Sequence, residues 1–190
     1  MSTVAVARMG AQVAIASDSL VTFGETRLPQ GYEANAKMFE VAGSYVGAVG
    51  TTAHMPVLQQ ALAALPADEL RLDSRDGIFE TFRRLHPLLK ERFFLNTREG
   101  DSDPYESSQF SILVANRHGI FGVESYREVF EFERFWAIGS GRRFALGGMY
   151  VAYARSKSAR EVAEAGVRAG CEFDTSSGGP VRVHTIKLKN

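Results

Sequence analysis

Strand-like and helix-like patterns alternate in blocks along this chain, and the order of the blocks limits the folds it can adopt. Alternating or continuous apolar runs predict strands at residues 3–8, 12–16, 37–41, 45–49, 110–115, 120–123, 128–132, 135–138 and 181–188. Apolar residues spaced three or four apart predict helices at residues 53–65, 74–93, 140–154 and 158–171. The order is therefore strands, two helices, strands, two helices and a last strand.

This order favours layers in which each pair of helices covers one sheet. Short turns between successive strands predict antiparallel pairing, because strands joined by a tight turn run in opposite directions. A helix pair that falls between groups of strands would bury its apolar side against the outer face of a sheet. We therefore expect an α+β fold, a four-layer αββα sandwich with two stacked antiparallel sheets, in which residues 1–190 form a single domain.

Local signals refine this expectation. Pro87 lies inside the second helical pattern and predicts a kink or break there. Ser158, followed three residues later by Glu161, forms a capping box that predicts the start of the fourth helix. Residues 17–35 are polar and contain glycine, and residues 98–106 are acidic, so we expect loops in both places.

Composition excludes several classes of function. The 190 residues carry 22 basic and 22 acidic side chains, so the formal net charge is zero and no basic footprint for nucleic acid or an anionic membrane is expected. No run of 18 apolar residues predicts a membrane span. The single cysteine, Cys171, cannot form an intrachain disulfide, which fits a reducing cytoplasm. The four histidines are scattered without metal-ligand spacing, and we expect capping or surface roles for them and neither a metal nor a cofactor.

The chain begins Met1-Ser2-Thr3, which raises the possibility of a terminal nucleophile. Ser2 is small, so removal of Met1 is expected, and serine with a free α-amine would remain. The pKa of such an amine is about 7.7–8.0, so a large fraction is unprotonated near neutral pH. A hydroxyl and its own base would then share one residue. While Met1 is attached, the Ser2 nitrogen is an amide without basicity.

Three further positions could support that chemistry. Asp18 ends the second predicted strand, and Lys37 begins the third. A lysine cation beside Ser2 would disfavour protonation of the amine, and Asp18 would hold the lysine charged. An exposed Asp–Lys pair of no catalytic value is the alternative. Gly50 lies where a strand turns into a helix, and its N–H could stabilise a developing oxyanion.

Six segments, in order and at compatible spacing, resemble proteasome β subunits and the bacterial heat-shock-locus peptidase, which are N-terminal-nucleophile hydrolases. They are residues 2–4, 15–19, 36–37, 47–53, 138–141 and 174–179. The resemblance covers nearly the whole chain and is greatest to bacterial proteasome homologues of the β-proteobacterial type. It implies the N-terminal-nucleophile hydrolase fold and peptide-bond hydrolysis through an acyl-enzyme.

The resemblance also implies roles for individual residues. The implied catalytic set is Ser2, Asp18, Lys37, Gly50, Ser140, Asp174 and Ser177. The last three would hold the terminal amine, and Ala48, Val49 and Thr52 would shape the pocket for the residue before the cut. Family members mostly have threonine where this chain has Ser2. Thr3 is the rival nucleophile, but strand alternation places it on the other face.

The same resemblance implies stacked rings of identical subunits with the sites inside, and a peptide or unfolded protein as substrate. No ATPase motif occurs, so folded substrates would need a separate ATP-dependent unfoldase. Two alternatives remain open from the sequence. One is a small-molecule amidase on the same fold, and the other is a ring-forming scaffold with a vestigial site.

Overall fold

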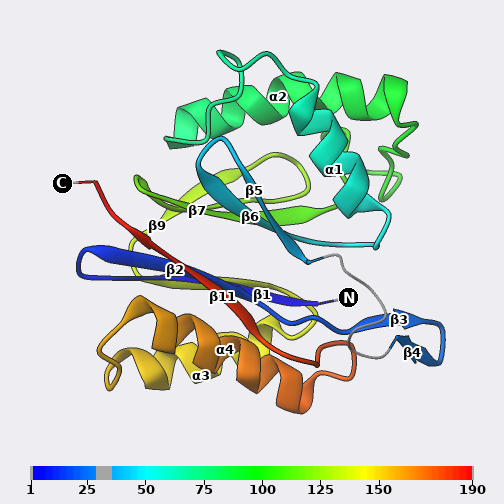
Figure 1. The fold of residues 1–190 in the computed structure, drawn as a ribbon. Helices are drawn as coiled ribbons and strands as arrows, with labels where there is room; N and C mark the ends of the chain where they lie inside the picture. Colours follow the sequence, from blue (N-terminus) through cyan, green and yellow to red (C-terminus); the bar gives the residue numbers. More distant parts are fainter. Residues whose placement is uncertain (1, 29–35, 190) are drawn as a thin grey trace.

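A computed structural model describes residues 2–28 and 36–189, and it contains two antiparallel sheets stacked on each other (Figure 1). The four-stranded sheet has the order β10-β1-β2-β11, and the five-stranded sheet has the order β5-β6-β7-β8-β9. The first sheet comprises β1 (Thr3–Met9), β2 (Gln12–Ser17), β10 (Phe135–Gly139) and β11 (Arg182–Lys187). The second comprises β5 (Met38–Val41), β6 (Ser44–Val49), β7 (Ser111–Asn116), β8 (Gly119–Val123) and β9 (Val129–Phe132).

Two helix pairs cover the outer faces of the sheets. Helices α1 (His54–Ala63) and α2 (Arg75–Arg92) lie over the five-stranded sheet, and α3 (Arg142–Tyr153) and α4 (Ala159–Phe173) lie over the four-stranded sheet (Figure 1). The four-layer sandwich predicted from the element order is therefore confirmed. In the part of the chain that the structure describes, no helix combines the length and the apolar character needed to cross a membrane.

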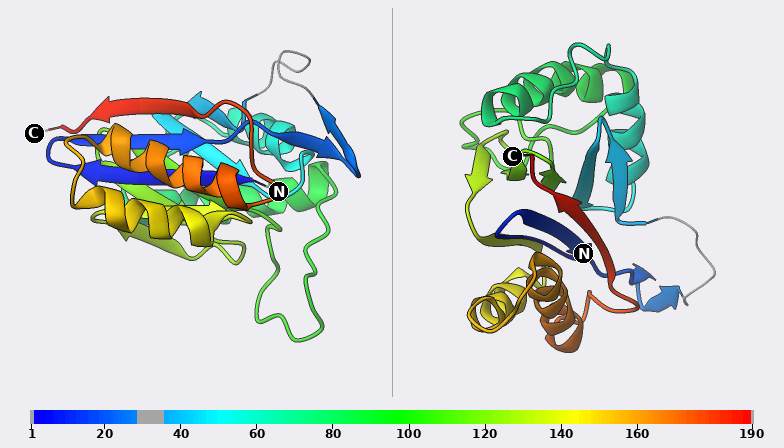
Figure 2. Two further views of the ribbon diagram at one scale, coloured as in Figure 1. Left: turned by 90° about the horizontal axis from the view of Figure 1, so that it is seen from below. Right: turned by 60° about the vertical axis from the view of Figure 1, so that its left-hand side comes forward.

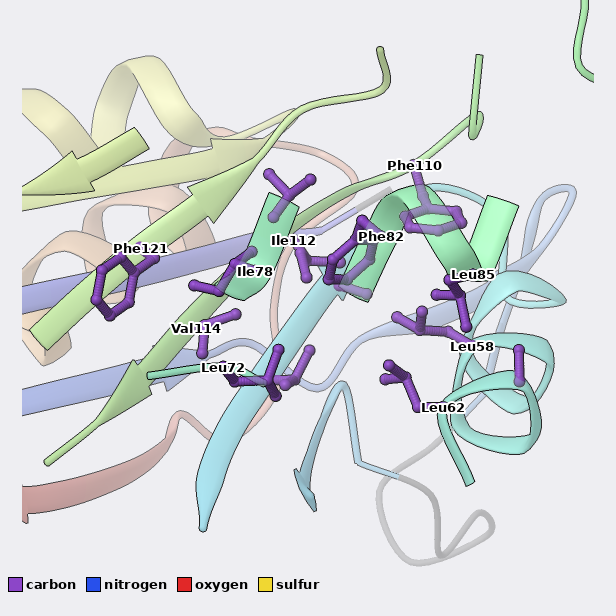
Figure 3. Packing of buried hydrophobic residues seen from close by; sticks show 14 of the residues in the cluster. Leu58, Leu62, Leu72, Ile78, Phe82, Leu85, Phe110, Ile112, Val114 and Phe121 are labelled. Carbon is purple, nitrogen blue, oxygen red and sulfur yellow. The ribbon is translucent and has the colours of Figure 1, made fainter. Parts of the chain in front are cut away.

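Three apolar clusters hold the layers together. The outer cluster lies between the five-stranded sheet and helices α1 and α2 (Figure 3). It includes Phe82 and Leu85 of α2, Leu58 of α1, and Ile112 and Phe121 of the sheet. A central cluster lies between the two sheets, and a third lies between the four-stranded sheet and α3 and α4. Burial of each large side chain contributes roughly 1.5–3 kcal/mol, so these layers supply most of the favourable free energy of folding.

Strand β1 divides its side chains between two of these clusters. Val4 and Val6 belong to the cluster between the sheets, whereas Ala5 and Ala7 face α3 and α4. Successive side chains of a strand point to opposite faces, so the residue before Thr3 continues the set that faces the second sheet. The same alternation that builds the core therefore decides which terminal hydroxyl faces which layer.

Two local predictions differ from the structure. Residues 17–35 were expected to be a loop, but β3 (Val21–Phe23) and β4 (Thr26–Leu28) form a short hairpin there, while residues 29–35 of that stretch lie outside the described residues. A kink or break was predicted at Pro87. The break does not occur, because α2 runs from Arg75 to Arg92 through this residue. Pro87 and Arg83, whose carbonyl loses its helical partner, are both exposed, so water can replace that hydrogen bond.

Candidate active site

Ser2 precedes the first residue of β1, and this strand lies inside its sheet between β10 and β2. Thr3 is opposite Gly139 of β10, and Val4 is opposite Ser17 of β2. Ser2 is 7% exposed and lines two cavities, whereas Thr3 is fully buried. The chain is thus held by neighbouring strands on both sides up to the residue expected to react. The predicted removal of Met1 lies outside the described residues.

Strand β10 can come this close to Ser2 because residue 139 is glycine. Its φ is 97°, a conformation that residues with a Cβ rarely adopt. A Cβ added at Gly139 would lie 1.9 Å from the Ser2 carbonyl oxygen. The neighbouring Ser140 hydroxyl is 3.5 Å from that oxygen. The Gly-Ser-Gly segment therefore brings a hydroxyl beside the start of β1 without a steric clash.

Asp18 and Lys37 form a buried ion pair. The Lys37 Nζ atom lies 2.9 Å from both Asp18 carboxylate oxygens, and the side chains are 13% and 0% exposed. Asp18 also accepts the backbone N–H groups of Thr3 (2.9 Å), Leu20 (3.1 Å) and Gly178 (3.0 Å). The exposed-pair alternative is therefore wrong. These bonds tie the lysine to β1 and to the chain that leaves β2.

Three hydroxyls and one carboxylate form a chain of hydrogen bonds beside β1. Ser140 and Ser177 each donate to Asp174 Oδ2 at 2.6 Å. Ser177 Oγ also lies 2.7 Å from Thr3 Oγ1. Thr3 therefore points toward the α4 side of the sheet, away from the cavities, as strand alternation predicted. The predicted residues of the last two segments do come together near Ser2.

Asp174 is tuned by its surroundings. Burial alone would raise its pKa, but the hydrogen bonds from Ser140, Ser177 and the backbone N–H of Ser176 lower the pKa below its usual range. Donors that bond to the charged form favour that form. A carboxylate stabilised in this way can keep the two serine hydroxyls oriented.

Gly50 lies between the end of β6 at Val49 and the start of α1 at His54, as the sequence predicted. Its φ of 144° and its closeness to His54, whose Nδ1 would be 2.7 Å from an added Cβ, explain the choice of glycine. Gly50 lines the same cavity as Ser2 and Lys37. Three of the predicted residues, from separate segments, therefore border one space.

That cavity, here called the first cavity, has a volume of about 280 Å³ and a largely apolar lining. Ala48, Val49 and Thr52 line it, as the resemblance implied. Sequence reasoning missed the wall that the β3–β4 hairpin and α1 supply. That wall includes Leu20, Val21, Phe23, Leu28 and Met55. The alternation of Val21, Thr22 and Phe23 before Gly24 was the signal that could have identified the hairpin.

His54 was expected on the surface or at a cap, and that prediction is wrong. Its half-buried ring lines the first cavity, and no side-chain bond caps α1. Burial lowers the pKa of His54, which favours the neutral ring. Its Nδ1 atom is buried and has no partner among the described residues. Across residues 2–28 and 36–189, no group of three His, Cys, Asp or Glu side chains could hold a metal ion.

Comparisons with solved structures give the class of fold. Thiobacillus denitrificans BPH in complex with epoxomicin aligns with a TM-score of 0.89 at 39% identity, covering 99% of this chain and 100% of that one. Another structure of Thiobacillus denitrificans BPH gives 0.90 at 40% identity, covering 98% of each chain. Eukaryotic HslV from Trypanosoma brucei gives 0.66 at 18% identity, covering 97% and 99%, and supports the fold alone. No protein-family model and no curated protein matches the sequence.

The fold is that of the N-terminal-nucleophile hydrolases found in proteasomes and HslV. Thiobacillus denitrificans BPH is a bacterial proteasome-like protein, and its identity to this chain extends over almost the full length of both. The chain belongs to the proteasome β-type and HslV-like family of peptidases. The expected family membership is thereby confirmed.

Proposed function

We propose that this chain is the subunit of a proteasome-like endopeptidase whose nucleophile is Ser2 after loss of Met1, with residues 1–190 acting as a single peptidase domain. The observation that carries the proposal is the meeting of Ser2, Lys37 and Gly50 on one cavity, with Lys37 held by the fully buried Asp18. Apolar residues of similar size stabilise a core about as well as a buried ion pair, so a lysine of such a pair on the cavity that Ser2 lines supports a role beyond packing.

Acylation begins when Ser2 Oγ attacks the substrate carbonyl carbon. The hydroxyl proton passes to the free Ser2 amine, directly or through water, and the carbonyl oxygen becomes an oxyanion that the Gly50 N–H binds. Loss of such a donor typically costs about 3–4 kcal/mol of barrier. The bond from carbon to the leaving nitrogen then breaks, and the leaving amine takes the proton. An ester on Ser2 remains, and water activated by the same amine hydrolyses it.

The charged and polar residues around Ser2 have separate roles in this mechanism. The Lys37 ammonium disfavours a second cation nearby and so keeps the Ser2 amine in its basic form. Asp18 keeps Lys37 oriented through two 2.9 Å contacts. Ser140, Asp174 and Ser177 hold the amine in position. Serine lacks the β-methyl group that restricts threonine, so its χ1 is freer and slower acylation than in a threonine enzyme is expected.

We further propose that identical subunits assemble into stacked rings with Ser2 facing the interior, in the cytoplasm. Peptides or unfolded proteins are the substrates, and folded proteins need a separate ATP-dependent unfoldase. The neutral net charge is permissive for self-association. Light scattering of the purified protein tests this assembly, because a monomer or dimer would contradict the ring and favour a small-molecule amidase.

Intact mass spectrometry before and after an epoxyketone or β-lactone probe tests the chemistry. We expect loss of Met1 and one covalent adduct per chain, mapped to residue 2. Ser2→Ala should lose the adduct, whereas Ser19→Ala should keep it, because the Ser19 hydroxyl bonds to the Pro180 carbonyl instead. Met1 retained on every chain without labelling would refute the proposal and favour a vestigial scaffold. An adduct mapped to Thr3 would refute the choice of nucleophile.

A further inference from the structure

Ser2 lies where two cavities meet. The first cavity was described above, and a second cavity of about 320 Å³ lies between Ser2 and the long loop that joins α2 to β7. Figure 2 (left) shows this loop projecting from the body at the end where the chain begins. The residues common to both cavities are Ser2, Val49 and Gly50. An atom attacked by Ser2 would therefore have one space on either side of it.

We propose that the second cavity binds the residue that follows the cleaved bond and that it favours a cationic side chain there, lysine or arginine. This inference rests on the proposed peptidase function. It deepens that function by adding a selective site on the leaving-group side and by naming Glu99 as the residue that selects.

The side of the cleaved bond that lies in each cavity follows from where the leaving nitrogen must be protonated. In the proposed mechanism that proton comes from the Ser2 amine, which Ser140 is assigned to hold, and Ser140 lines only the second cavity. Lys37 lines only the first. The walls of the first cavity, with Leu20, Val21 and Met55, suit an apolar side chain on the acyl side. The leaving side of the substrate is thereby assigned to the second cavity.

The two cavities differ in the charged side chain that lines them, which is Lys37 in the first and Glu99 in the second. Among the ten described residues that line it, Glu99 is the one with an ionisable side chain, and Gln109, Ser111, Ser125 and Ser140 add neutral polar groups. One carboxylate oxygen of Glu99, Oε1, accepts the Ser107 hydroxyl, which leaves Oε2 for a substrate. A carboxylate that is the one charged group lining a cavity attracts a cation and repels an anion.

The loop is braced, so Glu99 is held where a substrate can reach it. Its backbone N–H donates to Asp103 Oδ2 at 2.8 Å, and Tyr126 of the opposite segment donates to Asp103 Oδ1 at 2.7 Å. Gln109 Nε2 donates to the Arg98 carbonyl at 2.7 Å, and the Ser107 N–H donates to the Thr97 carbonyl at 2.8 Å. These bonds restrict the loop before a substrate arrives, which lowers the entropy cost of binding.

Quenched fluorescent peptides with one fixed acyl side and lysine, alanine or glutamate after the cut test the inference on the intact protein. We expect kcat/KM in the order lysine, alanine, glutamate, with each step about two- to fivefold, as for a partly exposed ion pair. The lysine-to-alanine ratio should fall toward one in Glu99→Gln and below one in Glu99→Lys. Raising the salt concentration should compress the wild-type ratio, because salt screens exposed charges.

Asp101→Asn is the matched control, because it removes the same charge from the same loop at a side chain that is 99% exposed. Its ratios should equal those of the wild type. Cleavage of all three peptides at equal rates, or equal ratios in wild type and Glu99→Gln, would overturn the inference and leave the peptidase proposal standing. Absence of cleavage together with absence of probe labelling at Ser2 would overturn both.

Discussion

Replacing Asp18 by asparagine should destabilise the protein strongly, although the two side chains have nearly the same shape. The Asp18 carboxylate accepts two contacts from Lys37 and three backbone N–H groups while fully buried. Asparagine offers one acceptor oxygen, and its NH₂ group would face donors. Breaking a buried ion pair from one side typically costs about 3–5 kcal/mol. For a domain of this size that loss lowers Tm by about 6–20 °C.

Urea denaturation of four proteins measures the effect: wild type, Asp18→Asn, Lys37→Met and the double variant. Because each single variant leaves one buried charge uncompensated, the double variant should lose less free energy of unfolding than the sum of the two, by about 2 kcal/mol or more. Glu80→Gln is the control, since the Arg83–Glu80 pair is 57% and 46% exposed and solvent screening should leave it little effect on stability.

The double-variant cycle also defines the result that would refute this reasoning. A loss below about 1 kcal/mol in Asp18→Asn, or strictly additive losses, would show that the pair does not hold these segments together. Under the proposed mechanism, peptidase activity should vanish in both single variants and should not return in the double variant, because restored packing does not restore the Lys37 ammonium.

Two further predictions concern residues around Ser2. Gly139→Ala should lower the free energy of unfolding by about 2 kcal/mol or more and abolish probe labelling, because its Cβ would overlap the Ser2 carbonyl and its φ is 97°. The control Gly147→Ala, in α3 with no atom within 4 Å of the added Cβ, should instead stabilise the protein by about 0.5–1 kcal/mol. Equal effects of the two variants on thermal unfolding would contradict this reasoning. The pKa of Asp174 is lowered from 3.8, so its carboxylate stabilises the fold above that value and the stabilisation is lost as pH falls through the lowered pKa. Asp174→Asn should therefore be less stable at neutral pH and lose less free energy of unfolding below about pH 4 than wild type, and parallel stability curves would count against this.

The layers were predictable because strand alternation and helical spacing recur along the sequence, and the meeting of several candidate site residues on one cavity agrees with the sequence-based expectation. The alternation of Val4 and Val6 with Ala5 and Ala7 encodes two buried faces of unequal side-chain size, which is what a strand between a sheet and a helix pair needs. The positions of Asp18 and Lys37 at strand ends were similarly informative. The distance between the Asp18 and Lys37 side chains could not be predicted, because the way the two sheets stack is decided by long-range packing.

The parts that sequence reasoning missed have weak local signals. The β3–β4 strands are three residues each, too short for periodicity to distinguish them from a loop, yet they supply one wall of the first cavity. Pro87 is a strong breaker in isolation, but the buried stripe of Phe82, Leu85 and Leu89 holds α2 on both sides of it. His54 has no neighbour in sequence that predicts its burial.

The direction of β11 decides where this protein can be attached to anything else. Arg182 is opposite Ser17, at the end of the sheet where β1 begins, and Lys187 is opposite Gln12, at the far end. Five residues of extended strand separate these ends by roughly 17 Å. A purification handle or surface tether fused after the last strand would leave the proposed reactive end free. The same handle in front of residue 2 would cap the nitrogen on which the proposed chemistry depends.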